Sequence, residues 1–145
     1  MPPVAVEIRN DVQSALPVSD VEALVQRLLD RLPEDREWRV TIRFVADRPM
    51  RALNKKYLGR DYPTDVLSFP TYDFQEGRPP ALPSGPLLLG EVVVNLDEAQ
   101  RISTASGHSL LREVQSKIAH GVQHLIGYHH NDEIQGREAW QKETS

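Results

Sequence analysis

The sequence predicts an α+β or α/β domain built around a small mixed sheet. Stretches with strand-type and helix-type periodicity alternate in the first half of the chain, whereas helical periodicity dominates the second half. The length of 145 residues suits one domain with one hydrophobic core. The composition, 39% hydrophobic and 26% charged, is ordinary for a globular protein. We therefore expect residues 1–145 to form a single domain.

Four segments are expected to form strands. Apolar side chains alternate with smaller or polar ones over residues 4–10. The alternation is more regular over 38–46, with apolar residues on one face and arginines on the other, which is typical of a half-buried strand. Residues 66–69 are a short apolar run, and residues 87–95 are rich in valine and leucine. The proline-rich stretch 71–86 between these last two segments predicts a loop.

Helical periodicity marks five further segments, which we expect to surround the sheet. The first helix is expected to begin with a capping box from Ser19 to Glu22 and to end at Pro33. Asp47 is expected to cap the second helix, with Pro49 in its first turn. The five predicted helices are residues 19–32, 47–57, 97–103, 109–126 and 132–143.

The composition also excludes several classes of protein. The chain contains no cysteine, which excludes disulfides and thiolate metal sites and fits a reducing compartment. The N-terminal residues lack a basic region followed by a long apolar run, and no window approaches 18 apolar residues. We therefore expect a cytoplasmic protein without a membrane span.

The charges of the chain are distributed unevenly. The net charge is −4, yet residues 36–60 hold eight Lys and Arg against two acidic residues, a local net charge of +6. A basic face of this kind can bind phosphate groups even on an acidic protein. A solvated helix face beside an exposed strand face would produce the same pattern, so charge alone leaves both interpretations open.

The most informative stretch begins at His120 and has the spacing H-x-x-x-H-x-x-G-x-x-H. His120 and His124 lie four residues apart on a predicted helix, the separation at which two imidazoles bind one metal ion. Gly127 suits a helix end, after which the chain can bring His130, or its neighbour His129, towards the ion. Three protein ligands with one open position are typical of a catalytic zinc site. The alternative is a set of unrelated histidines.

The same spacing occurs in zinc proteases, but with one difference. Those proteases carry a glutamate directly after the first histidine, where it acts as the general base. Here that position is Gly121. A metal site is therefore predicted, whereas a zinc peptidase is disfavoured.

Two signatures joined by a strand motif resemble one known family. The N-terminal signature is Thr64–Pro70, preceded by Leu53-Asn54 and Tyr57. The C-terminal signature and the strand motif comprise His120-Gly121, His124-Leu125, Gly127-Tyr128, His130 and Gly90-Glu91-Val92. In these residues the chain resembles the YbeY type of bacterial metal-dependent endoribonucleases, also described as ribosomal RNA maturation factors.

The resemblance implies one zinc ion held by His120, His124 and His130. It implies cleavage of single-stranded RNA, with roles in maturation of the 3′ end of small-subunit ribosomal RNA and in ribosome quality control. The expected partners are ribosomal RNA and proteins of the small ribosomal subunit. The implied fold is α+β, with a mixed sheet of about four strands, about five helices and a metal-bearing helix like that of the metzincins.

The chain departs from the family pattern at three positions. His129 stands where the family has aspartate, Gln123 replaces a leucine, and Leu58 replaces an arginine that the family places near the metal. Arg60, two residues after Leu58, is our candidate for the catalytic cation. We hypothesise that Arg60 assists attack on phosphorus by a zinc-activated water or by the 2′-OH of the substrate.

A non-catalytic function is the alternative. In that interpretation the chain is a metal-stabilised assembly factor that binds RNA or the ribosome, and the absence of arginine at Leu58 favours it. Loss of a ligand histidine distinguishes the two interpretations. An enzyme would lose turnover and keep RNA binding, whereas an assembly factor would lose RNA binding.

Overall fold

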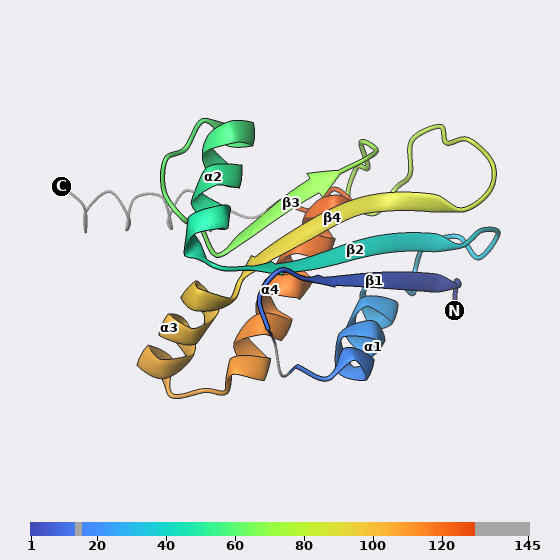
Figure 1. Ribbon diagram of the computed structural model, residues 1–145. Coiled ribbons are helices and arrows are strands. Elements are labelled where there is room, and N and C mark those ends of the chain that lie inside the picture. The colour runs from blue at the N-terminus through green and yellow to red at the C-terminus, as the bar shows by residue number, and fades with distance from the viewer. Residues whose placement is uncertain (14–15, 130–145) are drawn as a thin grey trace.

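The computed structural model describes residues 1–13 and 16–129 of the chain. The elements are β1 (Val4–Asn10), α1 (Val18–Leu28), β2 (Trp38–Val45), α2 (Asp47–Leu58), β3 (Val66–Pro70), β4 (Leu87–Asn95), α3 (Leu96–Ser106) and α4 (Leu110–Leu125). The described residues thus form four strands and four helices, an α+β arrangement (Figure 1). The predicted helix at 132–143 lies outside the described residues. No helix in the described ranges is long and apolar enough to cross a membrane.

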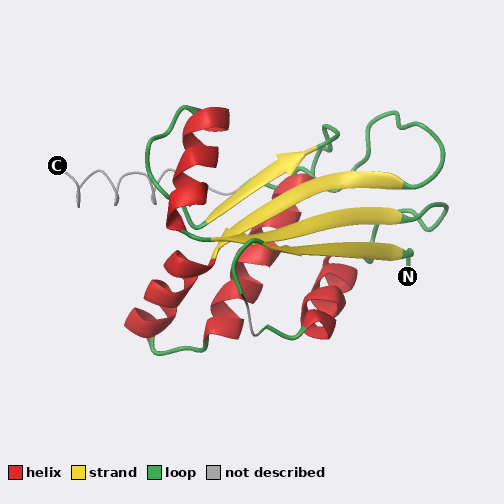
Figure 2. Ribbon diagram, in the orientation of Figure 1, coloured by secondary structure: helices red, strands yellow, loops and turns green. Residues whose placement is uncertain are grey.

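The four strands form one mixed sheet in the order β1-β2-β4-β3 (Figure 2). β1 is parallel to β2 and β2 is parallel to β4, whereas β3 is antiparallel to β4. The register between β2 and β4 shifts near Gly90, whose φ is 151°. A Cβ at that position would lie 2.3 Å from the carbonyl oxygen of Phe69, so glycine permits the close approach of β3.

The sheet buries both of its faces. Along β4, Val92 and Val94 belong to the main core, which includes side chains of α1 and α4, whereas Val93 belongs to a smaller cluster with Met50 of α2. This alternation follows from the two-residue period of a strand. α1 and α4 therefore cover one face and α2 covers the other, while α3 lies at the end of the sheet where β2 and β4 terminate (Figure 1).

α1 differs from its prediction at both ends. Pro17 is the N-cap and no side chain caps the helix, so the predicted capping box from Ser19 to Glu22 is wrong. The helix ends at Leu28, before the predicted end at Pro33. Leu32 is nevertheless buried in the turn that follows, because the turn returns its side chain to the core. The apolar periodicity therefore extended beyond the helix itself.

The N-termini of α2 and α3 are joined by polar side chains. Asp47 is the first residue of α2 and not its cap, contrary to the prediction, and its carboxylate accepts hydrogen bonds of 2.7 and 2.8 Å from Arg101. The side chain of Asn95 caps α3 by accepting from the backbone N–H of Asp97 at 3.0 Å. Asn95 also donates to Asp47 at 2.8 Å. With this cap, α3 extends over Leu96–Ser106, longer than predicted.

A cluster of charged side chains fixes α4 to the turn before β3. Glu113 is buried, with Oε2 2.6 Å from Nε2 of His108 and Oε1 3.4 Å from Nζ of Lys117. The same Nζ lies 3.0 Å from Oδ2 of Asp65. Burial alone would lower the pKa of Lys117, but the carboxylates of Asp65 and Glu113 outweigh it and raise this pKa above its ordinary value. Lys117 is therefore charged, and its ammonium group links Glu113 of α4 to Asp65 in the turn before β3.

Replacing Lys117 with methionine is expected to lower the free energy of unfolding by about 2–3 kcal/mol. The substitution leaves the buried carboxylate of Glu113 without its cation, and breaking a fully buried pair costs about 3–5 kcal/mol, discounted here for the partial exposure of Lys117 and Asp65. The measurement is urea unfolding at pH 7.

Lys55→Met is the matched control, because Lys55 is exposed and lies 4.0 Å from Asp61. We expect this control to cost less than about 0.5 kcal/mol. Equal losses for the two substitutions would contradict a structural role for the buried cluster.

Candidate metal centre

The histidine pair lies on α4, the longest helix of the described residues. Ser109 is its N-cap, and its Oγ accepts a hydrogen bond of 3.1 Å from the backbone N–H of Arg112. Apolar side chains at helical spacing then bury one face of the helix against the sheet. These are Val114, Ile118, Val122 and Leu125. The prediction of a helix over 109–126 is therefore accurate to one residue at each end.

His120 and His124 project from the same side of α4. Their ring centroids lie 4.6 Å apart and their planes differ by 25°, so the two imidazoles are stacked. Both side chains are half-buried, and Nε2 of His124 is shielded from solvent. The structure thus brings together two of the predicted metal ligands on a rigid element. Their role as ligands stays a prediction.

His130, the predicted third ligand, lies outside the described residues, and His129 is its predicted alternative. The ring of His129 is 5.6 Å from that of His124, at 77°, and is exposed. Among residues 1–13 and 16–129, no three His, Cys, Asp or Glu side chains are arranged to hold a metal ion, so His129 does not complete a site with the pair. The donor chemistry of two imidazole nitrogens fits a zinc-type ion.

Gly121, between the two histidines, packs directly against the sheet. A Cβ at Gly121 would lie 2.4 Å from Cγ1 of Val92 and 3.2 Å from Oγ of Ser68. That hydroxyl donates a 3.1 Å hydrogen bond to the carbonyl oxygen of Gly121. The position that carries the general base in zinc proteases therefore points into the core here and has no room for glutamate. The sequence pattern places Ser68 in the strand at 66–69 but gives no sign of its contact with α4.

The turn after the histidine pair agrees with the predicted helix end. Gly127 has φ of 90°, and its N–H donates to the carbonyl oxygen of His124 at 3.1 Å. The N–H of Tyr128 donates to the carbonyl oxygen of Gln123 at 2.9 Å. A Cβ at Gly127 would lie 2.2 Å from the carbonyl oxygen of Phe74. Glycine therefore allows α4 to stop directly after the pair while the loop at 71–86 packs against the turn.

Arg60, the predicted catalytic cation, lies in the connection from α2 to β3. Gly59 ends α2 with φ of 68°, and the backbone N–H of Arg60 donates to the carbonyl oxygen of Asn54 at 3.3 Å. The side chain of Arg60 is half-buried, whereas Leu58 and Tyr57 are exposed. The conformation of this connection places Arg60 beyond the end of α2, and its catalytic role stays a prediction.

Ion pairs within the chain neutralise part of the basic segment 36–60. Nη2 of Arg39 lies 3.0 Å from Glu37, and Nε of Arg51 lies 2.8 Å from Asp61. The side chain of Arg43 pairs with Asp11. The positive charge of this segment that is available to bind a ligand is therefore smaller than the count of its basic residues indicates.

The sequence matches a family of nucleases. The family model described as endoribonuclease YbeY matches residues 7–145. A curated relative of that name from Halalkalibacterium halodurans is 35% identical over 130 residues, which cover 84% of this chain and 81% of the relative. The chain belongs to the YbeY endoribonuclease family. The resemblance carried by the two signatures is thereby confirmed.

Other members of the YbeY family and one solved structure agree with this assignment. Relatives from Pelotomaculum thermopropionicum and Deinococcus radiodurans are 46% and 44% identical over 97 residues, 67% of this chain and 62% and 57% of theirs. The solution structure of TM1509 from Thermotoga maritima has a TM-score of 0.59 at 18% identity, covering 94% of this chain and 86% of that one. At this identity the structural similarity supports the fold alone.

Gly121→Ala is expected to lower the free energy of unfolding by about 1–3 kcal/mol. The added methyl overlaps Val92, and this cost exceeds the roughly 0.5–1 kcal/mol that alanine gains over glycine in a helix. In a Val92→Ala background the same substitution is expected to be neutral or stabilising, because Cγ1 and Cγ2 of Val92 are then absent. A double-mutant cycle by chemical denaturation measures the difference. Equal losses in both backgrounds would show that the contact is not the cause.

His120→Ala or His124→Ala is expected to weaken zinc binding by more than about 100-fold. Loss of a residue that only hydrogen-bonds to a metal ligand costs about 10–100-fold, and loss of a ligand itself is expected to cost more. His108→Ala and His129→Ala are expected to retain the metal, because His108 pairs with Glu113 and His129 does not complete a three-ligand group in the described structure. Elemental analysis of untagged protein and competitive zinc titration are the measurements. Equal metal retention in all four variants would rule out the site.

Proposed function

We propose that the chain is a zinc-dependent endoribonuclease that cleaves single-stranded RNA. In this proposal residues 1–145 form one catalytic domain in the cytoplasm. It acts in maturation of the 3′ end of small-subunit ribosomal RNA and in ribosome quality control. The observation that carries the proposal is the stacked pair His120 and His124 on α4, in a chain that belongs to a family of nucleases. His130 is the proposed third ligand.

The rigidity of α4 supports the proposed metal site. Both histidines lie on a helix whose depth on the sheet is fixed by the contact of Gly121 with Val92. Ligands on a rigid, packed element keep a productive geometry better than ligands on a loop. The chemistry that a bound zinc ion supplies is polarisation of a phosphoryl oxygen and activation of water.

Arginine and lysine side chains would hold the phosphates of the RNA. A guanidinium can bind a phosphate through two parallel hydrogen bonds, which is the role proposed for Arg60 in place of the family arginine absent at Leu58. The basic residues along α2 would hold the flanking backbone with an affinity that falls as salt rises and with little sequence preference. A substrate with a single 2′-deoxyribose at the cleavage position separates the two candidate nucleophiles, because loss of cleavage would identify the 2′-OH.

The competing function is a non-catalytic assembly factor that binds ribosomal RNA or proteins of the small ribosomal subunit. The observation that favours it is Leu58, which is exposed where the family carries an arginine. In this alternative the metal would stabilise the fold, and loss of a ligand histidine would abolish RNA binding together with folding.

His124→Ala is expected to abolish cleavage while leaving RNA affinity within about threefold, because phosphate contacts dominate affinity. Arg60→Ala is expected to reduce the cleavage rate by about 10²–10³-fold, the usual effect of removing one group that stabilises transition-state charge. Arg31→Ala is the matched control, since Arg31 is exposed in the turn after α1. The assay compares zinc-loaded proteins on single-stranded and duplex RNA of one sequence. An inactive wild type with intact binding would support the assembly factor instead.

A further inference from the structure

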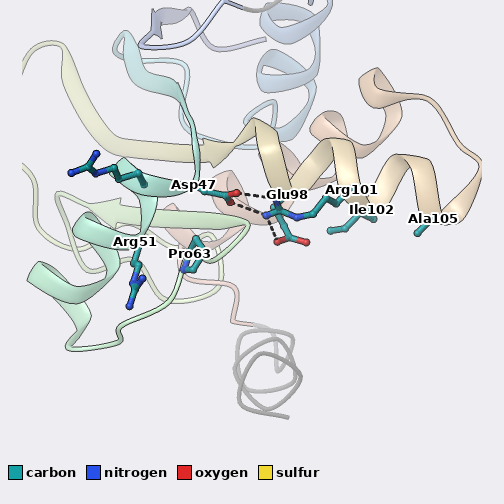
Figure 3. Close-up of a pocket in the computed structure, with 8 residues that line it drawn as sticks. Asp47, Arg51, Pro63, Glu98, Arg101, Ile102 and Ala105 are labelled. Carbon is teal, nitrogen blue, oxygen red and sulfur yellow. Dashed lines mark hydrogen bonds and ion pairs between the residues drawn. The ribbon is translucent and has the colours of Figure 1, made fainter. Parts of the chain in front are cut away.

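A groove of about 730 Å³ opens between α2 and α3 (Figure 3). It lies at the carboxyl ends of β2 and β4, which are adjacent and parallel. The chain leaves β2 into α2 on one face of the sheet and leaves β4 into α3, which continues to α4 on the other face. Where the connections from two adjacent parallel strands leave to opposite faces of the sheet, a crevice forms between them. Ligands usually bind in this crevice in sheets with parallel strands. The topology therefore makes this groove a candidate binding site.

The groove is separate from the histidine pair. The part of α4 that carries the histidines packs on the middle of β4, from Gly90 to Val92. The groove lies beyond Asn95, the last residue of that strand. At about 3.3 Å per residue, Val92 and Asn95 are roughly 10 Å apart along β4. A ligand in the groove would therefore contact the protein away from the proposed reaction centre.

The lining combines apolar surface with cationic side chains. Pro63, Ile102 and Ala105 supply apolar surface, and Arg48 and Arg51 stand on the α2 side. The volume falls within the range of about 300–1,000 Å³ found for small-molecule sites, which are mostly apolar with a few polar groups. An apolar surface beside guanidinium groups matches a flat base joined to a phosphate.

The acidic residues of the groove are already paired. Asp47 and Glu98 both bind Arg101, with distances of 2.7 and 2.8 Å, and Figure 3 shows the three side chains turned towards one another. Hydrogen bonds from Arg101 hold the pKa of Asp47 below its usual value, so this carboxylate stays ionised and paired. Their pairing limits repulsion of an anionic ligand by the α3 side of the groove.

The two arginines of α2 that line the groove are more available to bind a phosphate than Arg101. Arg48 is exposed and has no hydrogen bond or ion pair within the described parts of the chain. Arg51 pairs with Asp61 at 2.8 Å, but both side chains are about half exposed, and such a pair exchanges readily for a phosphate. The α2 side of the groove therefore carries the positive charge that a phosphate requires.

We propose that this groove binds one nucleotide of single-stranded RNA, with its base against Pro63, Ile102 and Ala105 and its phosphate on Arg48 and Arg51. The site would act as a second anchor for RNA whose scissile phosphate lies at the histidine pair. The inference rests on the proposed function to the extent that the nucleotide belongs to the RNA substrate.

The test uses two substitutions that alter the groove and one that does not. Arg48→Glu reverses the charge available to a phosphate, and Ala105→Trp places a bulky side chain in the lining from an exposed position of α3. Arg31→Glu is the matched control, because it makes the same charge change at an exposed residue in the turn after α1. Circular dichroism and thermal unfolding establish that all three variants are folded.

Two probes report on the groove. Adenosine 5′-monophosphate, added to the ¹⁵N-labelled full chain, is expected to shift the amide resonances of α2 and α3 residues that line the groove, and both groove substitutions are expected to remove these shifts. The affinity for a 12-nucleotide single-stranded RNA is expected to fall about tenfold in each groove variant, the usual effect of losing one stacked base or phosphate contact. Arg31→Glu is expected to change this affinity by less than about twofold.

The outcomes separate this inference from the proposed function. Normal RNA affinity in both groove variants, with no groove shifts on addition of the mononucleotide, would overturn the groove site even if the wild type cleaves RNA. Groove shifts and weakened RNA binding in a wild type that cleaves nothing would instead uphold the site and reject the nuclease. Shifts with the mononucleotide but unchanged RNA affinity would overturn the anchor and leave a site for free nucleotides.

Discussion

The close contact between α4 and β4 at Gly121 is the constraint on which the candidate site depends. The absence of a side chain lets the helix backbone approach Val92, and the hydrogen bond from Ser68 fixes it there. His120 precedes this contact and His124 follows it by one turn, so the sheet sets the direction of both imidazoles. The same contact separates the chain from the zinc proteases, because their general base would have to occupy the interior of this core.

Local patterns in the sequence predicted the parts of the fold that depend on local rules. Alternation located β1 and β2, and short apolar runs located β3 and β4. Gly127 located the end of α4, because its positive φ and close packing require glycine. The pairing of His120 with His124 follows from helical geometry alone. What alternation does not encode is the order of the strands, which depends on contacts between distant segments.

Several features that sequence reasoning missed involve partners far apart in the chain. Asp47 looked like a helix cap, but Arg101, 54 residues later, recruits its carboxylate. Lys117 and Asp65 belong to segments whose proximity exists only after α4 docks on the sheet. The count of basic residues likewise took no account of ion pairs such as Arg43 with Asp11. Long-range electrostatic pairing therefore decides which charges stabilise the fold and which remain for a ligand.

The position of β4 in the sheet has a consequence for the order in which the protein is assembled. Within the described sheet, β4 is the only neighbour of β3 and the second neighbour of β2. β4 follows β3 only after a loop of 16 residues. A chain emerging from the ribosome therefore exposes an unpaired β3 until β4 has been synthesised. Since α4 packs on both strands and comes later still, the histidine pair is among the last features that this fold can complete.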